Sequence, residues 1–357
     1  MRLASFSALD LYFGERPRHV ASVFAEASLG DAAKTFESLD FPGSVFADAV
    51  WEYGGMTVLF RCVDSLSSIP RSRFPVLDLL YDEGRRVFTD RFGVYPELRE
   101  PELRRNETGE ALSYWEALAY SAVLISRFPF SKPEKPNPPD TPQPLLSAFD
   151  QRILLTLILE SGSPERGLSY LMDAGFVAAH WPLLASLNDT SHGKEYHPEG
   201  NVWEHTLETF QYRKTRDLTL SLALLLHDCG KPLSQKNEGK TFDGHAQIGS
   251  IWAARFLSGL GFPQSLTDDV SFLVDQHMLP AFIPKLPVSR TGHVLSSELF
   301  PLLLEVYRCD ISSTYRGPEG YYDACKAYRA YLRHVKNPFR SSDGKKILHM
   351  YVEGFSK

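Results

Sequence analysis

The sequence contains few cysteines and no long apolar segment. Its four cysteines are far apart and form no CxxC pair: Cys62, Cys229, Cys309 and Cys325. This spacing excludes a disulfide-rich scaffold and a thiolate zinc finger. The longest apolar runs are well short of the ~18 residues that a membrane helix needs, and the first residues lack the apolar core of a secretory signal. We therefore expect a cytoplasmic protein with no membrane association.

A strong excess of basic residues is also absent. The net charge is −6, and a protein this acidic does not coat nucleic acid indiscriminately, so no specificity for DNA is expected. The charge is uneven, because residues 326–357 hold eight Lys and Arg against two acidic residues, which leaves −12 for the rest. This basic C-terminal tail is more often a solvated helix, but it could also contact RNA or phosphates.

Proline is concentrated in one place. Seven prolines lie between residues 129 and 144, a density that forbids helix and favours an extended spacer. With 357 residues the chain is long enough for two domains. We predict an N-terminal domain over residues 1–128, a linker over 129–144 and a second domain over 145–357.

The two predicted domains differ in their local patterns. Before the linker, Ser44–Val63 contains two strand-like runs around Gly54 and Gly55, which is a hairpin signal, whereas Ala21–Leu39 is predicted to be a helix. After the linker, helical periodicity dominates from residue 150 to residue 335. The predicted fold class is α+β: a small mixed α/β domain followed by an all-α domain.

Histidines and aspartates occur at the edges of successive predicted helices in the second half. The spacing lets each helix deliver one ligand to a shared centre. One such histidine alone is more often a core or capping residue, but the whole set favours a metal site. The candidate metal ligands are His205, His227, Asp228, His245, His277 and Asp310.

The strongest local signal is the adjacent pair His227-Asp228. It follows the apolar helix Leu218–Leu226 and precedes Gly230, a helix stop signal. Two polar groups at the end of a buried helix carry a desolvation cost unless they are paired or bind a metal. Imidazole and carboxylate together suit a divalent metal, and we predict one or two ions of Mn, Fe, Ni, Co, Zn or Mg.

This pattern resembles the HD superfamily of metal-dependent phosphohydrolases. The family's His, His-Asp and distant Asp match His205, the pair His227-Asp228, and Asp310. His245 and His277 match two further ligands of members with two metals. Lys231, in HDCGKP, matches the family's lysine near a bound phosphate, although it could also be an ordinary exposed lysine.

A narrower resemblance covers about residues 150 to 335. The stretch 171–209, with its HPEGNVWEHT segment, looks like the middle of bacterial tRNA nucleotidyltransferases, the CCA-adding enzymes that carry a C-terminal HD domain. The segments LALLLHDCGKP, GHAQIGS and CDISSTYRG continue the match. His197 and Glu199 would either orient His205 from behind the metal ligands or cap its helix.

The N-terminal half resembles the nucleotidyltransferase head of the same family in a degenerate form. The two metal-binding carboxylates of the family are replaced by His19 and Ala21. Nucleotidyl transfer of this type needs carboxylates that hold two Mg²⁺ ions. The imidazole of His19 is a poor Mg²⁺ ligand, and the methyl group of Ala21 is not a ligand. Asp10 or Asp31 could compensate, although neither belongs to an Asp-x-Asp pair. The resemblance therefore implies a head that keeps the fold without the reaction.

The function expected from these residues is that of a metal-dependent HD-type phosphohydrolase. Its substrate would be a phosphomonoester, a cyclic phosphodiester, a nucleotide or an RNA end, with tRNA as one candidate. Asp228 and Lys231 would be catalytic, by bridging two cations and by binding phosphate. The alternatives are tRNA nucleotidyltransferase activity and a non-catalytic RNA-binding protein with a structural metal. The sequence does not predict an oligomeric state.

Overall fold

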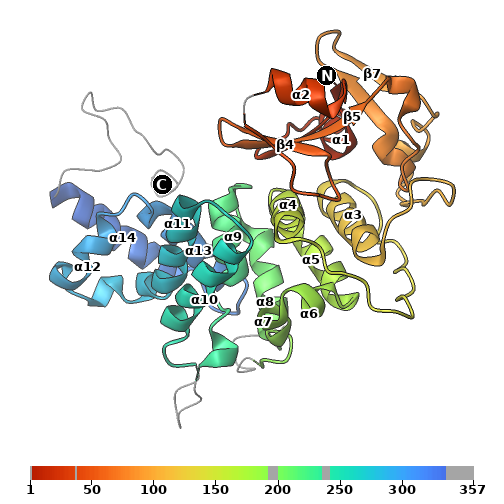
Figure 1. Cartoon of the computed structure of the whole chain (residues 1–357). Coiled ribbons are helices and arrows are strands. Elements are labelled where there is room, and N and C mark those ends of the chain that lie inside the picture. The colour runs from red at the N-terminus through yellow and green to blue at the C-terminus, as the bar shows by residue number, and fades with distance from the viewer. Residues whose placement is uncertain (1, 37, 192–199, 235–241, 335–357) are drawn as a thin grey trace. The chain divides into compact units, whose positions relative to one another are not determined.

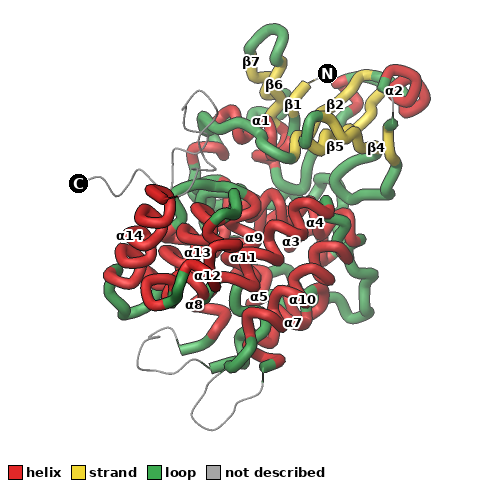
Figure 2. The backbone as a smooth tube through the Cα atoms, turned by 90° about the vertical axis from the view of Figure 1, so that its left-hand side faces the viewer, coloured by secondary structure: helices red, strands yellow, loops and turns green. Residues whose placement is uncertain are grey.

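The chain forms two compact units, Met1–His180 and Trp181–Lys357. The structure is a computed structural model that describes residues 2–36, 38–191, 200–234 and 242–334. All named strands belong to the first unit, and the described part of the second is built from helices (Figure 2). The predicted α+β class is confirmed.

A seven-stranded mixed sheet organises the first unit, with the strand order β3-β4-β5-β2-β1-β6-β7. Strands β2 and β5 pair in parallel, and the other neighbours are antiparallel. The predicted hairpin is confirmed, because β4 and β5 turn at Gly54 and Gly55, whose φ angles are +57° and +80°. The strands are β1 Arg2–Leu3, β2 Val20–Glu26, β3 Leu39–Asp40, β4 Ala49–Tyr53, β5 Met56–Val63, β6 Leu79–Asp82 and β7 Val87–Asp90.

The predicted helix over Ala21–Leu39 is wrong. The segment forms the central strand β2 and then the short helix α2, Leu29–Thr35, which begins where the Ser28 side chain accepts a hydrogen bond from the Asp31 amide. The sequence VASVFAE fits either state locally. Pairing with β5 on one side and β1 on the other decides for the strand, because tertiary context overrides weak propensity.

Helices complete the first unit (Figure 1). Between α3 and α4 lies the proline-rich segment, which contains no helix or strand. Helix α3 packs against both α4 and α5, so this compact unit continues to His180, beyond the predicted linker. The domain limits drawn from the sequence stay a prediction. The helices are α1 Ser5–Tyr12, α2 Leu29–Thr35, α3 Tyr114–Arg127, α4 Ala148–Leu159, α5 Pro164–Asp173 and α6 Phe176–His180.

The described part of the second unit is a bundle of helices. No described helix has the length and apolar character to cross a membrane. The part of the basic tail beyond residue 334 lies outside the described residues. The helices are α7 Pro182–Ser186, α8 Val202–Thr209, α9 Leu218–Leu226, α10 His245–Gly259, α11 Gln264–Gln276, α12 Val288–Leu295, α13 Phe300–Ser312 and α14 Glu319–His334.

Helix α9 lies in the core of this bundle. It packs against α8, α11 and α13, which explains why LTLSLALLL has almost no polar face. The turn after α9 also packs closely on α10: a Cβ atom on Gly230 would lie 2.0 Å from the His245 carbonyl oxygen. Gly230 is therefore required by close packing.

Candidate metal centre

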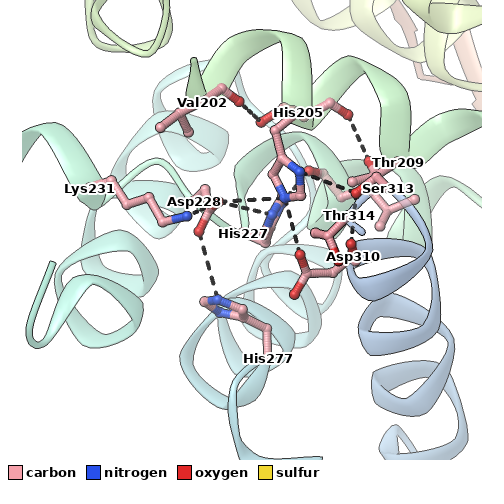
Figure 3. A network of polar contacts seen from close by, with 12 residues as sticks. Val202, His205, Thr209, His227, Asp228, Lys231, His277, Asp310, Ser313 and Thr314 are labelled. Atoms are coloured by element: carbon pink, nitrogen blue, oxygen red, sulfur yellow. Dashed lines mark hydrogen bonds and ion pairs between the residues drawn. The ribbon is translucent and has the colours of Figure 1, made fainter. Parts of the chain in front are cut away.

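The predicted ligands converge in the second unit from α8, α9, α10, α11 and α13 or the turns directly after them. Figure 3 shows His205, His227, Asp228, His277 and Asp310 at this centre. His205 comes from α8, and Asp310 from α13. His227 caps the C-terminus of α9, and Asp228 follows it directly. His245 begins α10, and His277 caps the C-terminus of α11. All of these residues are buried except Asp310, whose side chain is 20% exposed.

The six residues form two groups of three whose ligand atoms lie within 4.8 Å of one another. His205, His227 and Asp310 form the first group, and Asp228, His245 and His277 form the second. Both groups meet at Asp228. Its Oδ2 atom lies 3.2 Å from His227 Nε2, and its Oδ1 atom lies 3.5 Å from His245 Nε2. The Asp228 carboxylate therefore lies between the two groups.

Every histidine of the centre directs Nε2 inward because its Nδ1 atom has a partner elsewhere. The Nδ1 atoms of His227, His245 and His277 lie 2.7–2.9 Å from backbone carbonyl oxygens. A carbonyl only accepts, so each Nδ1 carries the proton and each Nε2 carries a lone pair.

His205 follows the same rule through a hydroxyl group. Its Nδ1 atom lies 3.1 Å from Ser313 Oγ, which donates its own proton to the Asp310 carbonyl at 2.7 Å. The serine oxygen is therefore the acceptor, and His205 Nε2 is left with a lone pair. Orientation of ligand imidazoles by such outer partners is typical of metal sites.

These lone pairs face one another. His245 Nε2 and His277 Nε2 are 3.2 Å apart, and His205 Nε2 lies 3.1 Å from the Asp310 carboxylate. The buried Nε2 of His227 has no hydrogen-bond partner among the described residues, although the Asp228 carboxylate lies 3.2 Å away. Acceptors at these separations repel unless a proton or a cation lies between them. The donor set therefore fits divalent metal.

The pKa values favour a cation over a proton. Burial lowers the pKa of His277 to about 4, and burial also lowers the pKa of His245. Burial alone would raise the pKa of Asp228, but neighbouring positive charge, including that of Lys231, holds it well below the usual range. At neutral pH these imidazoles are neutral and this carboxylate is ionised, the forms that bind metal.

Lys231 lies beside the centre. Its Nζ atom is 2.5 Å from Asp228 Oδ2 and 5.5 Å from the centre of the Phe242 ring. The lysine side chain is 11% exposed, so its charge is partly shielded from solvent. The structure thus brings this residue to the Asp228 carboxylate.

His197 and Glu199, which the sequence predicts beside the centre, lie outside the described residues. Ser313, which holds His205, was missed, although its position three residues after Asp310 places both on one helical face.

In the first unit, neither of the two positions that the resemblance assigns to metal-binding carboxylates holds one. His19 and Ala21 lie at the start of β2, next to Thr57 on the parallel strand β5. Arg127 binds both carboxylate oxygens of Asp10, at 2.5 and 2.9 Å. Asp31 lies at the exposed start of α2.

Two other acidic residues lie near the N-terminal ends of β2 and β5. Glu160, buried after α4, binds the Nδ1 atom of His19, and its second carboxylate oxygen has no hydrogen-bond partner among the described residues. Glu52 on β4 accepts a hydrogen bond of 2.9 Å from the Thr57 hydroxyl and lies 3.3 Å from Arg152. The carboxylates near this end of β2 and β5 therefore come from β4 and from the residue after α4, and not from the start of β2.

The chain is homologous to tRNA nucleotidyltransferases over about half of its length. It is 30% identical over 196 residues to the CC-adding tRNA nucleotidyltransferase of Thermus thermophilus, covering 52% of this chain and 43% of that protein. It is 30% identical over 172 residues to the A-adding tRNA nucleotidyltransferase of Deinococcus radiodurans, covering 46% and 39%. The chain thus spans less than half the length of these curated relatives.

Other comparisons add little. No family model matches the chain. A crystal structure of the Bacillus stearothermophilus CCA-adding enzyme in complex with CTP aligns with 94% of this chain and 78% of its own, at 17% identity and a TM-score of 0.45.

The phosphohydrolase function expected from the sequence is wrong. The relatives are named as nucleotidyltransferases that add CC or A to tRNA. A set of metal ligands does not by itself define a reaction, so the ligand pattern does not establish hydrolysis.

Proposed function

We propose that this protein acts on the 3′ end of tRNA as a nucleotidyltransferase. The observation that carries the proposal is the 30% identity over 196 residues to an enzyme that adds CC to tRNA. The substrates would be a tRNA and a nucleoside triphosphate.

The geometry of the first unit supports a specific pair of residues for this reaction. Nucleotidyl transfer uses carboxylates that hold Mg²⁺ at the attacking and leaving oxygens. Glu160 and Glu52 are the acidic groups next to His19 and Thr57, at the start of β2 and β5. A bound Mg²⁺ would supply positive charge to the triphosphate there. These two carboxylates would hold it.

The test is incorporation of radiolabelled CTP and ATP into a tRNA that lacks its 3′ CCA. We expect incorporation by the unmodified chain and at least a hundredfold loss in Glu160→Gln and in Glu52→Gln. Glu83→Gln, in an exposed turn, is the matched control and should keep full activity. Equal incorporation by all variants would remove these carboxylates from the reaction.

A second candidate function is tRNA binding without nucleotide transfer. The observation that favours it is that the two positions which the resemblance assigns to metal-binding carboxylates hold His19, just before β2, and Ala21, within β2. Binding of tRNA in a gel-shift assay, together with no incorporation at high Mg²⁺ or Mn²⁺, would decide for this candidate.

We further propose that the second unit is an HD-type domain whose six ligands hold one or two divalent cations. The support is the set of inward-facing Nε2 lone pairs around Asp228. A cation there would supply positive charge to RNA phosphate oxygens. Asp228 would hold the cation, and Lys231 would add a further positive charge next to a bound phosphate.

A further inference from the structure

A buried ion pair lies on α13, the helix that carries Asp310. Glu305 is 1% exposed, and the side chain of Arg308, one turn further along the helix, is 16% exposed. The Arg308 guanidinium binds both carboxylate oxygens of Glu305, with Nε 2.8 Å from Oε2 and Nη2 2.5 Å from Oε1. A two-point contact of this kind fixes the orientation of both side chains.

The ion pair also binds the chain segment that joins α8 to α9. Arg308 Nη2 donates a hydrogen bond to the Tyr212 carbonyl oxygen. The Lys214 backbone amide donates a hydrogen bond of 3.2 Å to Glu305 Oε1. Hydrogen bonds to charged groups are stronger than those between neutral groups. The two side chains therefore connect α13 firmly to the backbone between α8 and α9.

The same segment is bound to the first turn of α9. Arg213 Nη1 donates a hydrogen bond of 2.6 Å to Ser221 Oγ, and Ser221 Oγ donates one of 2.7 Å to the Asp217 carbonyl oxygen. Asp217 in turn caps α9, because its side chain accepts a hydrogen bond from the Leu220 amide. Polar contacts through this one segment therefore join α8, α9 and α13.

These three elements carry the first group of ligands. His205 comes from α8, His227 caps the C-terminus of α9, and Asp310 comes from α13 (Figure 3). His205 Nε2 lies 3.1 Å from the Asp310 carboxylate. This distance joins α8 to α13, the two elements that the ion pair connects through the segment after α8.

The second group of ligands has a different support. His245 and His277 come from the start of α10 and the end of α11. Within the described part of the chain, the hydrogen bonds that Glu305 and Arg308 make to other elements go to residues 212 and 214, and not to α10 or α11. The ion pair is therefore placed to affect the first group and not the second.

Small displacements matter at a metal centre, because ligand distances must lie within about 0.2 Å of their ideal values. Tyr212 is seven residues after His205, and the helix α8 continues between them as a tighter helical turn over Phe210–Tyr212. At about 1.5 Å per residue the two positions are about 10 Å apart along this stiff element. A displacement at Tyr212 therefore moves His205 relative to Asp310.

We propose that Glu305 and Arg308 are positioning residues for the cation of the first group and not for that of the second. The ion pair holds the segment after α8 against α13, and this contact sets the separation of His205 and Asp310. The inference rests on the metal centre proposed above. It adds that the two groups of ligands depend on different supporting contacts.

The test replaces the ion pair by apolar side chains of similar volume in the double variant Glu305→Leu/Arg308→Met. Removing both charges together leaves no unpaired buried charge, and such a replacement is often neutral for stability. Tyr212 is half-buried and Lys214 is exposed, so water can satisfy their backbone groups in the variant. Urea denaturation of the full chain checks that the second unit is folded.

A second variant, Arg308→Lys, serves if the double variant does not fold. Lysine keeps the positive charge but lacks the planar fork that contacts Glu305 and Tyr212 together. It should show the same selective effect on the first group. The matched control is Asp323→Leu/Lys326→Met, which removes an exposed ion pair of the same spacing from α14.

The measurement is a Zn²⁺ titration of the full chain, followed through the side-chain ¹⁵N NMR signals of the histidines. These signals show which ring nitrogens bind the cation. In wild type and in the control, the Nε2 signals of all four ligand histidines should shift. In the double variant, His205 and His227 should need about ten- to a hundredfold more Zn²⁺, whereas His245 and His277 should respond as in wild type.

The other outcomes separate this inference from the metal centre itself. An unchanged response of His205 and His227 in the double variant would overturn the inference. Equal weakening at all four histidines would also overturn it, because the ion pair would then stabilise the whole unit. So would a wild type in which only His245 and His277 respond. No response at any of these histidines in wild type would reject the proposed metal centre.

Discussion

The Nε2 atoms of His245 and His277 lie 3.2 Å apart, and the Nδ1 atoms of both rings are hydrogen-bonded to backbone carbonyls. Two lone pairs that face each other at this distance, beside the buried Asp228 carboxylate, have a physical explanation if a cation lies among them. This relationship leads to predictions about metal binding, packing and RNA recognition.

Replacing Ser313 by alanine should weaken metal binding without unfolding the chain. The serine oxygen accepts the Nδ1 proton of His205, and loss of such an outer partner lowers metal affinity by about ten- to a hundredfold. Competition with a chelating dye measures the change. Ser296→Ala, at the exposed end of α12, should bind metal like wild type. Identical affinities for both variants would show that Ser313 does not orient the ligand.

Gly230→Ala should destabilise the second unit. The new Cβ atom would meet the His245 carbonyl at 2.0 Å and the Gly249 amide at 2.6 Å, and such overpacking costs about 3 kcal/mol. Gly259→Ala, in α10 with open space around its Cβ position, is the control and should be neutral or slightly stabilising. Urea denaturation of both variants measures the difference. A fully stable Gly230→Ala protein would contradict the close packing of this turn on α10.

Lys231→Ala should weaken binding of CMP while leaving the metal content unchanged. A charge-assisted contact to phosphate contributes about 1.5–3 kcal/mol, which is roughly a ten- to hundredfold change in Kd. Lys326→Ala removes an exposed lysine from α14 and is the matched control. Calorimetric titration of both variants provides the measurement. If CMP binds equally well without Lys231, the lysine does not contact phosphate.

Asp78→Asn should stabilise the first unit at pH 8 and have little effect near pH 4. Burial raises the pKa of Asp78 to about 6, although a hydrogen bond from the Ser72 amide opposes the shift. The folded state therefore holds the proton more tightly than the unfolded state. Stability from the protonated form is lost as the pH rises through 6, at a cost of up to about 3 kcal/mol.

Denaturation at pH 4.5 and at pH 8 tests this linkage. The gap in unfolding free energy between Asp78→Asn and wild type should widen as the pH rises. A gap that stays constant would mean that Asp78 has an ordinary pKa in the folded chain.

The helical periodicity of the second unit agrees with its observed helices, and the structure brings the candidate ligands together, for a physical reason. His227 and Asp228 follow an apolar helix, so periodicity places them at a buried helix end whatever the packing details. The parallel pairing of β2 with β5 is harder to predict from the sequence, because VASVFAE becomes a strand only through pairing with its neighbouring strands. The close approach of Gly230 to His245 and the contact of Glu160 with His19 also depend on folding, since they join residues distant in sequence.

The most direct test of the metal centre is elemental analysis of purified protein after loading with Mn²⁺ or Zn²⁺ and dialysis. Wild type should retain one or two metal ions per chain. Asp228→Ala should lose most of them, because its carboxylate lies between both ligand groups. Asp268→Ala, on the exposed face of α11, should match wild type. Metal-free wild type, or the same stoichiometry in wild type and Asp228→Ala, would contradict the account.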